Sequence, residues 1–122
     1  MLAAEVCDAE HAKPQISSDA RARIAEFRRS VGVVTERLVA FHEGPTAACR
    51  EWPSESWGEL ADRFNRIGCK VIQLGSKRRG NLKKFPKAQL EGTISALDMF
   101  SLEDSIALIS VCDLFVGIDS GL

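Results

Sequence analysis

Short apolar runs that alternate with amphipathic helical patterns constrain the fold of this chain more than any other feature. Three runs, at residues 37–42, 70–75 and 114–118, are bounded by glycine, proline or acidic residues. Each is long enough for a buried strand and too short for an ordinary helix. Because helical patterns separate the runs, the sequence predicts an α/β fold with a parallel sheet and helices on its faces.

Apolar residues spaced three and four positions apart predict the helices. The first helix follows Ser17 and closes at Gly32, and a second begins near Ser54 or Ser56 and stops at Gly68. Their expected apolar faces are Ala20, Ile24, Phe27 and Val31 in the first helix, and Trp57, Leu60, Ala61, Phe64 and Ile67 in the second.

Two serine and acidic residue pairs have the spacing of a capping box, in which each side chain bonds to the other's backbone N–H. Ser56 with Glu59 is one pair, and Ser101 with Asp104 opens a third helix after a short strand at 93–97. The apolar positions expected to mark this third helix are Leu102, Ile106, Ile109 and Cys112.

Composition is that of one folded domain. The chain has 122 residues, 45% hydrophobic and 27% charged. With 16 Lys and Arg against 17 Asp and Glu, its formal net charge is -1, so no global field favours nucleic acid as a partner. No apolar stretch is long enough to span a membrane and the N-terminus lacks a secretory signal, which predicts a cytoplasmic location. Four scattered cysteines are interpreted as reduced thiols: Cys7, Cys49, Cys69 and Cys112.

Two polar segments follow predicted strands, at the sheet edge where parallel sheets bind ligands. One is the loop from Gly44 to Pro53, and the other is Asp119-Ser120-Gly121. Backbone N–H groups and a carboxylate in the second segment suit a phosphorylated or hydroxyl-rich ligand. A helix is expected after the last strand and the sequence does not include one, so we expect the chain to belong to a longer protein.

Several motifs occur together over residues 36–122, in an order that resembles the carboxyl-terminal domain of glycosyltransferase family 9. The best-known members of that family are the ADP-heptose:lipopolysaccharide heptosyltransferases. The motifs are His42-Glu43-Gly44, Arg50-Glu51-Trp52-Pro53 with the helix up to Ala61, Leu74-Gly75, Ser101-Leu102, and Val116-Gly117-Ile118-Asp119-Ser120-Gly121-Leu122.

The resemblance implies a GT-B architecture, in which two Rossmann-like domains bind the acceptor and the sugar nucleotide and catalysis occurs between them. The chain would then be a truncated second domain, with residues 1–17 as a connector and 18–122 as a partial sugar-nucleotide-binding domain. The implied partners are a nucleotide-sugar donor, ADP-heptose first, and a glycolipid or saccharide acceptor. Neither a metal nor another cofactor is implied, and the catalytic base would lie on the other domain.

The resemblance also assigns roles to residues of the two polar segments. Arg50 would stabilise the charge that grows on the leaving diphosphate, and Thr46 would donate a hydroxyl to it. Asp119 would accept hydrogen bonds from sugar hydroxyls, while the amides around Ser120 and Gly121 approach the diphosphate. Two simpler interpretations stay open, since Arg50 also suits a solvated loop and Asp119 a helix cap.

The basic loop at residues 76–87 departs from the family pattern. Many relatives carry an acidic residue shortly after the preceding strand, whereas this chain has Ser76-Lys77-Arg78-Arg79. The nucleobase of the donor therefore stays open. The loop is interpreted either as solvated surface or as a site for a phosphorylated acceptor or the anionic inner-membrane surface. Phe85 is its only aromatic residue, and the lack of further stacking platforms disfavours nucleic acid.

Three functions remain from the sequence: part of an inverting glycosyltransferase, a nonenzymatic sugar-nucleotide or phosphate-binding module, and an inactive partial reading frame. In the first, this segment alone is expected to be inactive. Of the aromatic residues in the motifs, Trp57 is expected in the core and Trp52 with Pro53 at the helix entry. His42 is expected to be structural.

Overall fold

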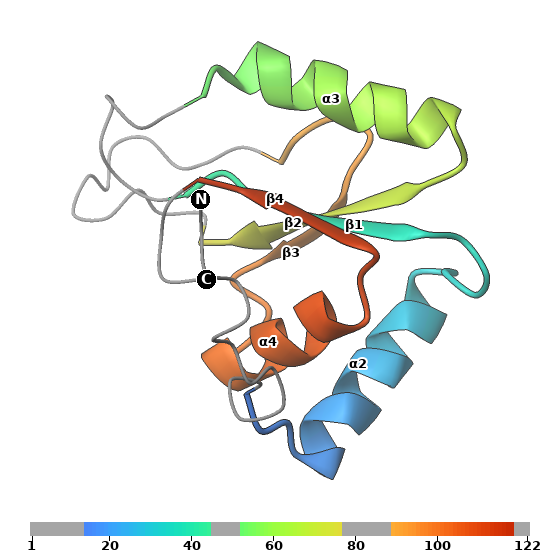
Figure 1. The fold of residues 1–122 in the computed structure, drawn as a ribbon, viewed down its shortest axis with the longest axis vertical. Helices are drawn as coiled ribbons and strands as arrows, with labels where there is room; N and C mark the ends of the chain where they lie inside the picture. The colour runs from blue at the N-terminus through green and yellow to red at the C-terminus, as the bar shows by residue number, and fades with distance from the viewer. Residues whose placement is uncertain (1–13, 45–51, 77–88, 119–122) are drawn as a thin grey trace, which may run out of the picture.

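The computed structural model describes residues 14–44, 52–76 and 89–118, and within them helices and strands alternate as the sequence predicts (Figure 1). The elements are α2 (Ser18–Ser30), β1 (Leu38–His42), α3 (Ser54–Arg66), β2 (Lys70–Gly75), β3 (Ile94–Leu97), α4 (Leu102–Ser110) and β4 (Leu114–Gly117).

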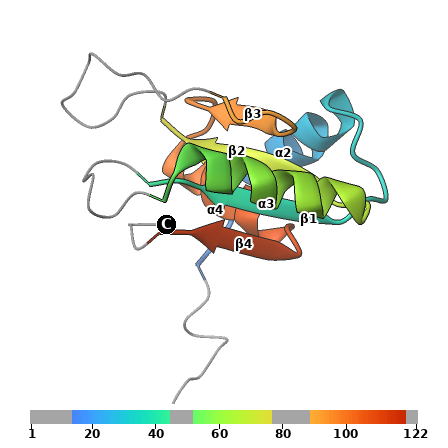
Figure 2. The same cartoon turned by 90° about the horizontal axis from the view of Figure 1, so that it is seen from above.

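The four strands form one parallel sheet in the order β3-β2-β1-β4. This is the order of the first strands of a doubly wound dinucleotide-binding fold. Helix α3 covers one face of the sheet, and α2 and α4 cover the other (Figures 1 and 2). The predicted α/β architecture with a Rossmann-like parallel sheet is therefore confirmed.

The central strands are largely apolar because both of their faces are covered. In β1, Leu38 and Ala40 pack with α2 and α4, while Val39 and Phe41 pack with α3. All four side chains are buried. Successive residues of a strand point to opposite faces, so a strand between two helical layers is a continuous apolar run.

Strand β4 lies at the edge of the sheet and is much less buried. The side chain of Leu114 is 46% exposed, and those of Phe115 and Val116 are only partly covered. Phe115 packs toward the α2 and α4 face, whereas Val116 and Ile118 pack toward α3. Phe115 and Ile118 are both partly exposed at this edge.

Helix α2 ends in a glycine-closed turn, as the sequence predicts. Ser17 caps its start, where the Ala20 amide donates to Ser17 Oγ over 3.1 Å. At the other end, Gly32 has φ +75° and its amide donates to the Arg29 carbonyl, while the Val33 amide donates to Arg28. This pair of bonds is a Schellman motif, which needs a residue of positive φ at the position of Gly32.

The two predicted capping boxes are not formed as such. Helix α3 starts at Ser54, and the Ser56 amide donates to the Pro53 carbonyl, so Ser56 already lies in the first turn. The Glu59 carboxylate instead pairs with Arg63, one turn further along the helix. Ser101 does cap α4, accepting from the Asp104 amide, but the Asp104 side chain turns to α2.

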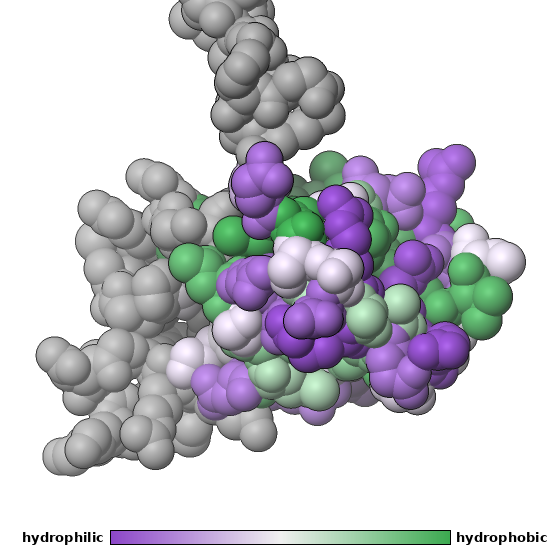
Figure 3. Space-filling view, turned by 90° about the horizontal axis from the view of Figure 1, so that it is seen from below, coloured by the Kyte–Doolittle hydropathy of each residue, from purple (hydrophilic) through white to green (hydrophobic). Residues whose placement is uncertain are grey.

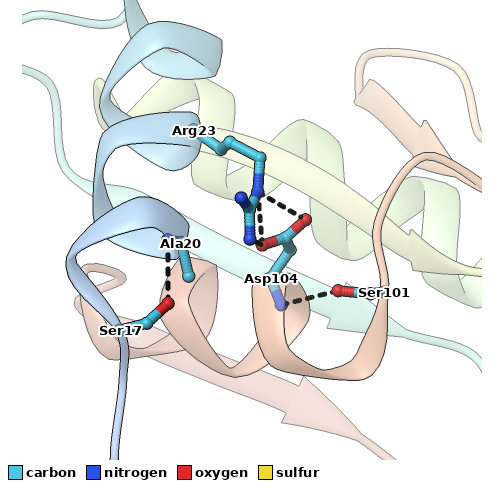
Figure 4. Close-up of polar contacts among 5 residues, drawn as sticks. All are labelled: Ser17, Ala20, Arg23, Ser101 and Asp104. Atoms are coloured by element: carbon cyan, nitrogen blue, oxygen red, sulfur yellow. Dashed lines mark hydrogen bonds and ion pairs between the residues drawn. The ribbon is translucent and has the colours of Figure 1, made fainter.

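That side chain forms a bidentate ion pair with Arg23, which joins α4 to α2 (Figure 4). Arg23 Nη2 and Asp104 Oδ1 are 2.7 Å apart. The hydrogen bonds from Arg23 lower the pKa of the Asp104 carboxyl, and the same pairing raises the pKa of Arg23. The outer face on this side of the molecule shows hydrophilic side chains interspersed with smaller apolar areas (Figure 3).

Two residues expected on buried helix faces are exposed. Ile67 is 75% exposed because α3 ends at Arg66 and Ile67 lies in the closing turn. Leu102 is 64% exposed because it is the first residue of α4, whose buried positions are Asp104, Ala107 and Leu108. None of the helices in the described ranges has the length and apolarity needed to cross a bilayer.

Candidate functional site

The strand order creates a topological switch point between β1 and β4. From β1 the chain crosses one face of the sheet through α3 to reach β2, and it later returns through α4 on the other face to β4 (Figure 2). The two described crossovers on either side of this point therefore lie on opposite faces of the sheet. In open parallel sheets the crevice at such a point is where ligands bind.

The ends of these two strands are in direct contact. The Ile118 amide donates to the His42 carbonyl over 3.3 Å, continuing the register that pairs His42 with Gly117. Gly44 has φ +74°, and a Cβ atom placed on it would lie 2.0 Å from Ile118 Cδ1. Only glycine fits this position, both for its backbone angle and for the approach of Ile118.

All five predicted site residues lie outside the described residues, so their roles stay predictions. The described chain nevertheless shows where their segments begin. Thr46 and Arg50 follow Gly44 in the sequence, and the segment Asp119-Ser120-Gly121 follows Ile118 directly. Because Gly44 and Ile118 touch, the two segments start from one point at the switch of the sheet.

Two buried polar residues near this point were not predicted as part of the site. Gln73 on β2 is fully buried and Glu43, just after β1, is 7% exposed. The Leu90 amide donates to Gln73 Oε1 over 2.9 Å, and Gln73 Nε2 donates to Glu43 Oε1 over 3.4 Å. The sequence carried a signal for the first, since Gln73 interrupts the apolar run Val71–Leu74.

His42 packs against the end of the neighbouring strand. Gly75 has φ +122°, and a Cβ placed there would lie 3.3 Å from His42 Cδ2. The imidazole is partly buried, and its ring fills the space that the glycine leaves. This packing agrees with the structural role expected for His42.

The two tryptophans differ as the sequence predicts. Trp57 is 2% exposed and packs against Phe41 with ring centroids 5.1 Å apart. Trp52 is 45% exposed and meets Trp57 edge to face at 5.2 Å, at the entry to α3. The indole N–H of Trp57 is buried and finds no hydrogen-bond acceptor within the described structure.

Two of the four cysteines lie in the described part of the chain. Cys69 and Cys112 are free thiols, and burial raises the pKa of Cys112 to about 11, so it stays protonated at neutral pH. Cys7 and Cys49 lie outside the described residues. Within residues 14–44, 52–76 and 89–118, no group of three or more His, Cys, Asp or Glu side chains is placed to hold a metal ion.

Comparison with solved structures identifies similar folds. A glycosyltransferase of family 9 from Veillonella parvula DSM 2008 matches with a TM-score of 0.76 and 29% identity, over 88% of this chain and 31% of that one. The ADP-heptose LPS heptosyltransferase II of E. coli matches in fold with a TM-score of 0.65 and 23% identity, over 89% of this chain and 34% of that one. The chain thus spans about a third of the length of either protein.

Sequence comparison gives a family. No curated protein matches the chain. The sequence profile of glycosyltransferase family 9 (heptosyltransferase), however, matches residues 1–122. Since this match covers the full sequence and the parallel sheet agrees with the fold of the matched structures, the chain belongs to glycosyltransferase family 9.

Proposed function

We propose that this chain supplies the sugar-nucleotide-binding part of an inverting glycosyltransferase that transfers heptose from ADP-heptose to a lipopolysaccharide core or related acceptor. The observation that carries the proposal is the contact between Gly44 and Ile118, which starts both predicted donor-binding segments at the switch point. Family membership supports the transferase activity. The choice of donor and acceptor follows the name of the similar E. coli protein.

The predicted residues suit the charge changes of this reaction. When the sugar leaves, negative charge grows on the diphosphate, and a guanidinium held beside it stabilises the transition state more than the ground state. We assign this role to Arg50, with the hydroxyl of Thr46 as a second donor. Asp119 would bind sugar hydroxyls, and the amides of Ser120 and Gly121 the diphosphate.

The proposed domain organisation places the other half of the reaction outside this segment. Residues 1–17 would connect to an acceptor-binding domain that holds the catalytic base, and residues 18–122 would belong to the donor-binding domain. The chain by itself would then bind donor without turning it over. We also propose a cytoplasmic location, with the basic loop at 76–87 meeting the acceptor or the anionic inner-membrane surface.

Calorimetric titration with ADP and UDP tests the donor site and the nucleobase together. Arg50→Ala is expected to weaken ADP binding by about tenfold or more, since it removes a charged hydrogen-bonding group. Asp119→Asn should weaken the binding of ADP-heptose and leave that of ADP nearly unchanged, since Asp119 would contact the hydroxyls of the sugar. Arg66→Ala is the matched control, because Arg66 is exposed on α3 and pairs only with Asp62 among the described contacts. Equal loss in all three variants, or no ADP binding by the unaltered chain, would contradict the proposal.

Titration alone does not separate an enzyme from a binding module. A longer protein that carries this segment should transfer heptose from ADP-heptose to a lipid A core acceptor, with Arg50→Ala strongly impaired. Donor binding without any transfer would favour the nonenzymatic module instead.

A further inference from the structure

A buried chain of polar contacts links β1, β2 and the segment that precedes β3. Gln73 lies in the middle of β2, between residues whose side chains are apolar. Its side chain accepts from the Leu90 amide, at the segment that leads into β3, and donates to Glu43 at the end of β1. One fully buried amide therefore joins the middle of β2 to the end of β1 and to the segment that leads into β3.

The contact from Leu90 fixes the orientation of the Gln73 amide. A backbone N–H requires an acceptor, so the oxygen of Gln73 must face Leu90 and its NH2 group must face Glu43. The donor is thus aimed at a carboxylate that is itself 7% exposed. Reversing the amide would place its NH2 group against the Leu90 N–H and its oxygen against the carboxylate, and both contacts would be lost.

We propose that Gln73 is a positioning residue, which through Glu43 holds the carboxyl end of β1 where Gly44 meets Ile118. Glu43 directly precedes Gly44, so the position of its side chain bears on the backbone that approaches Ile118. An apolar side chain would fill the same place in β2 without any link to Glu43. Buried polar contacts of this kind fix geometry because breaking them in a low-dielectric interior leaves costly unpaired groups.

The consequence for donor binding rests on the proposed function. If the segments beginning after Gly44 and Ile118 bind one nucleotide, their separation must be set before the ligand arrives. Gln73 then acts on affinity without touching the ligand.

Two backbone hydrogen bonds on the β1 and β4 pair offer an internal comparison. The Ile118 amide donates to His42 at the carboxyl end, and the Asp113 amide donates to Leu38 at the opposite end. The ratio of their hydrogen-exchange rates, measured by NMR without nucleotide, reports local opening at the carboxyl end. Global destabilisation moves both rates together and leaves the ratio unchanged.

Gln73→Met keeps the approximate side-chain volume and removes both contacts. We expect it to raise the ratio of Ile118 to Asp113 exchange about tenfold. Gln73→Glu should raise it as well, because two carboxylates would then face each other. The double variant Glu43→Gln with Gln73→Glu restores one amide and one carboxylate, and should lower the ratio below that of Gln73→Glu alone.

Thr93→Val is the matched control. The Thr93 hydroxyl donates to the Leu90 carbonyl over 2.7 Å and is buried, so its loss disturbs the same turn without reaching Glu43. An unchanged ratio in Gln73→Met, the same rise in Thr93→Val, or no recovery in the double variant would each overturn the inference.

ADP titration separates the two proposals. Gln73→Met should bind ADP about tenfold more weakly than the unaltered chain, while Thr93→Val should not. If the unaltered chain fails to bind ADP, the proposed function fails and the exchange ratio still decides the role of Gln73. If it binds ADP and Gln73→Met binds equally well, the positioning of the donor site by Gln73 is refuted.

Discussion

Replacing Gly44 by alanine should destabilise the chain through two separate physical effects. At φ +74° an L-residue costs about 1–2 kcal/mol relative to glycine. The added methyl would also lie 2.0 Å from Ile118 Cδ1 and 2.1 Å from Ile118 Cγ1, far inside van der Waals contact. Overpacking of this kind costs about 1–3 kcal/mol once the neighbours have shifted. The expected total loss for Gly44→Ala is about 2–5 kcal/mol.

Gly32 provides a control that separates the two effects. Its φ is +75°, almost the same as at Gly44, but a Cβ there would meet nothing within 4 Å. Gly32→Ala should therefore show only the backbone cost of about 1–2 kcal/mol. The difference between the two variants isolates the contact with Ile118.

Urea unfolding followed by circular dichroism measures both free energies. In the double variant Gly44→Ala with Ile118→Ala, the side chain that obstructs the new methyl group is shortened. The double variant should therefore lose less free energy of unfolding than the sum of the losses in the two single variants. Equal losses in Gly44→Ala and Gly32→Ala, with additive behaviour in the double variant, would show that β1 and β4 do not meet as described. The shared starting point of the two site segments would then be lost.

Three further outcomes are expected. Arg23 lowers the pKa of Asp104, so the stability that this carboxylate contributes is fully present above its unfolded pKa of about 4 and is lost as pH falls through the lower folded pKa. Melting temperatures measured between about pH 2.5 and 7 should therefore fall less steeply on the acid side for Asp104→Asn than for the unaltered chain. Trp57→Ala should lower the free energy of unfolding in urea by about 3–5 kcal/mol. Trp57→Phe should lower it clearly less, because it keeps a ring against Phe41 and removes an N–H that has no acceptor in the described structure. Equal losses in the two variants would refute this. In a longer enzyme that carries this segment, Arg50→Ala should lower kcat about a hundredfold while weakening donor binding less, and unchanged kinetics in a folded variant would favour a solvated loop arginine.

Local sequence patterns were enough to predict the elements of this fold. Apolar runs identified β1, β2 and β4, because the strands of a parallel sheet that helices cover on both faces are largely apolar. Serine before an apolar periodic segment and glycine after it marked the ends of α2, since those residues satisfy the free backbone groups there. The parallel direction followed from the crossover helices, which leave little choice of handedness.

Partners distant in the sequence were beyond such patterns. Asp104 has the spacing of a capping-box residue, yet its carboxylate binds Arg23, 81 positions away along the chain. Ser56 and Glu59 likewise fit the spacing, but the Pro53 carbonyl already closes the first turn of α3. A capping pattern states which local bonds are available, and the competing partners come from packing.

The candidate site divides in the same way. The sequence determined that polar segments follow β1 and β4, and its motifs indicated the family. Only the tertiary structure placed β4 beside β1, brought Ile118 against Gly44 and set Gln73 between Leu90 and Glu43. Strand order and buried polar contacts depend on which faces and edges meet when the helices cover the sheet, and that choice is made by the packing of the whole chain.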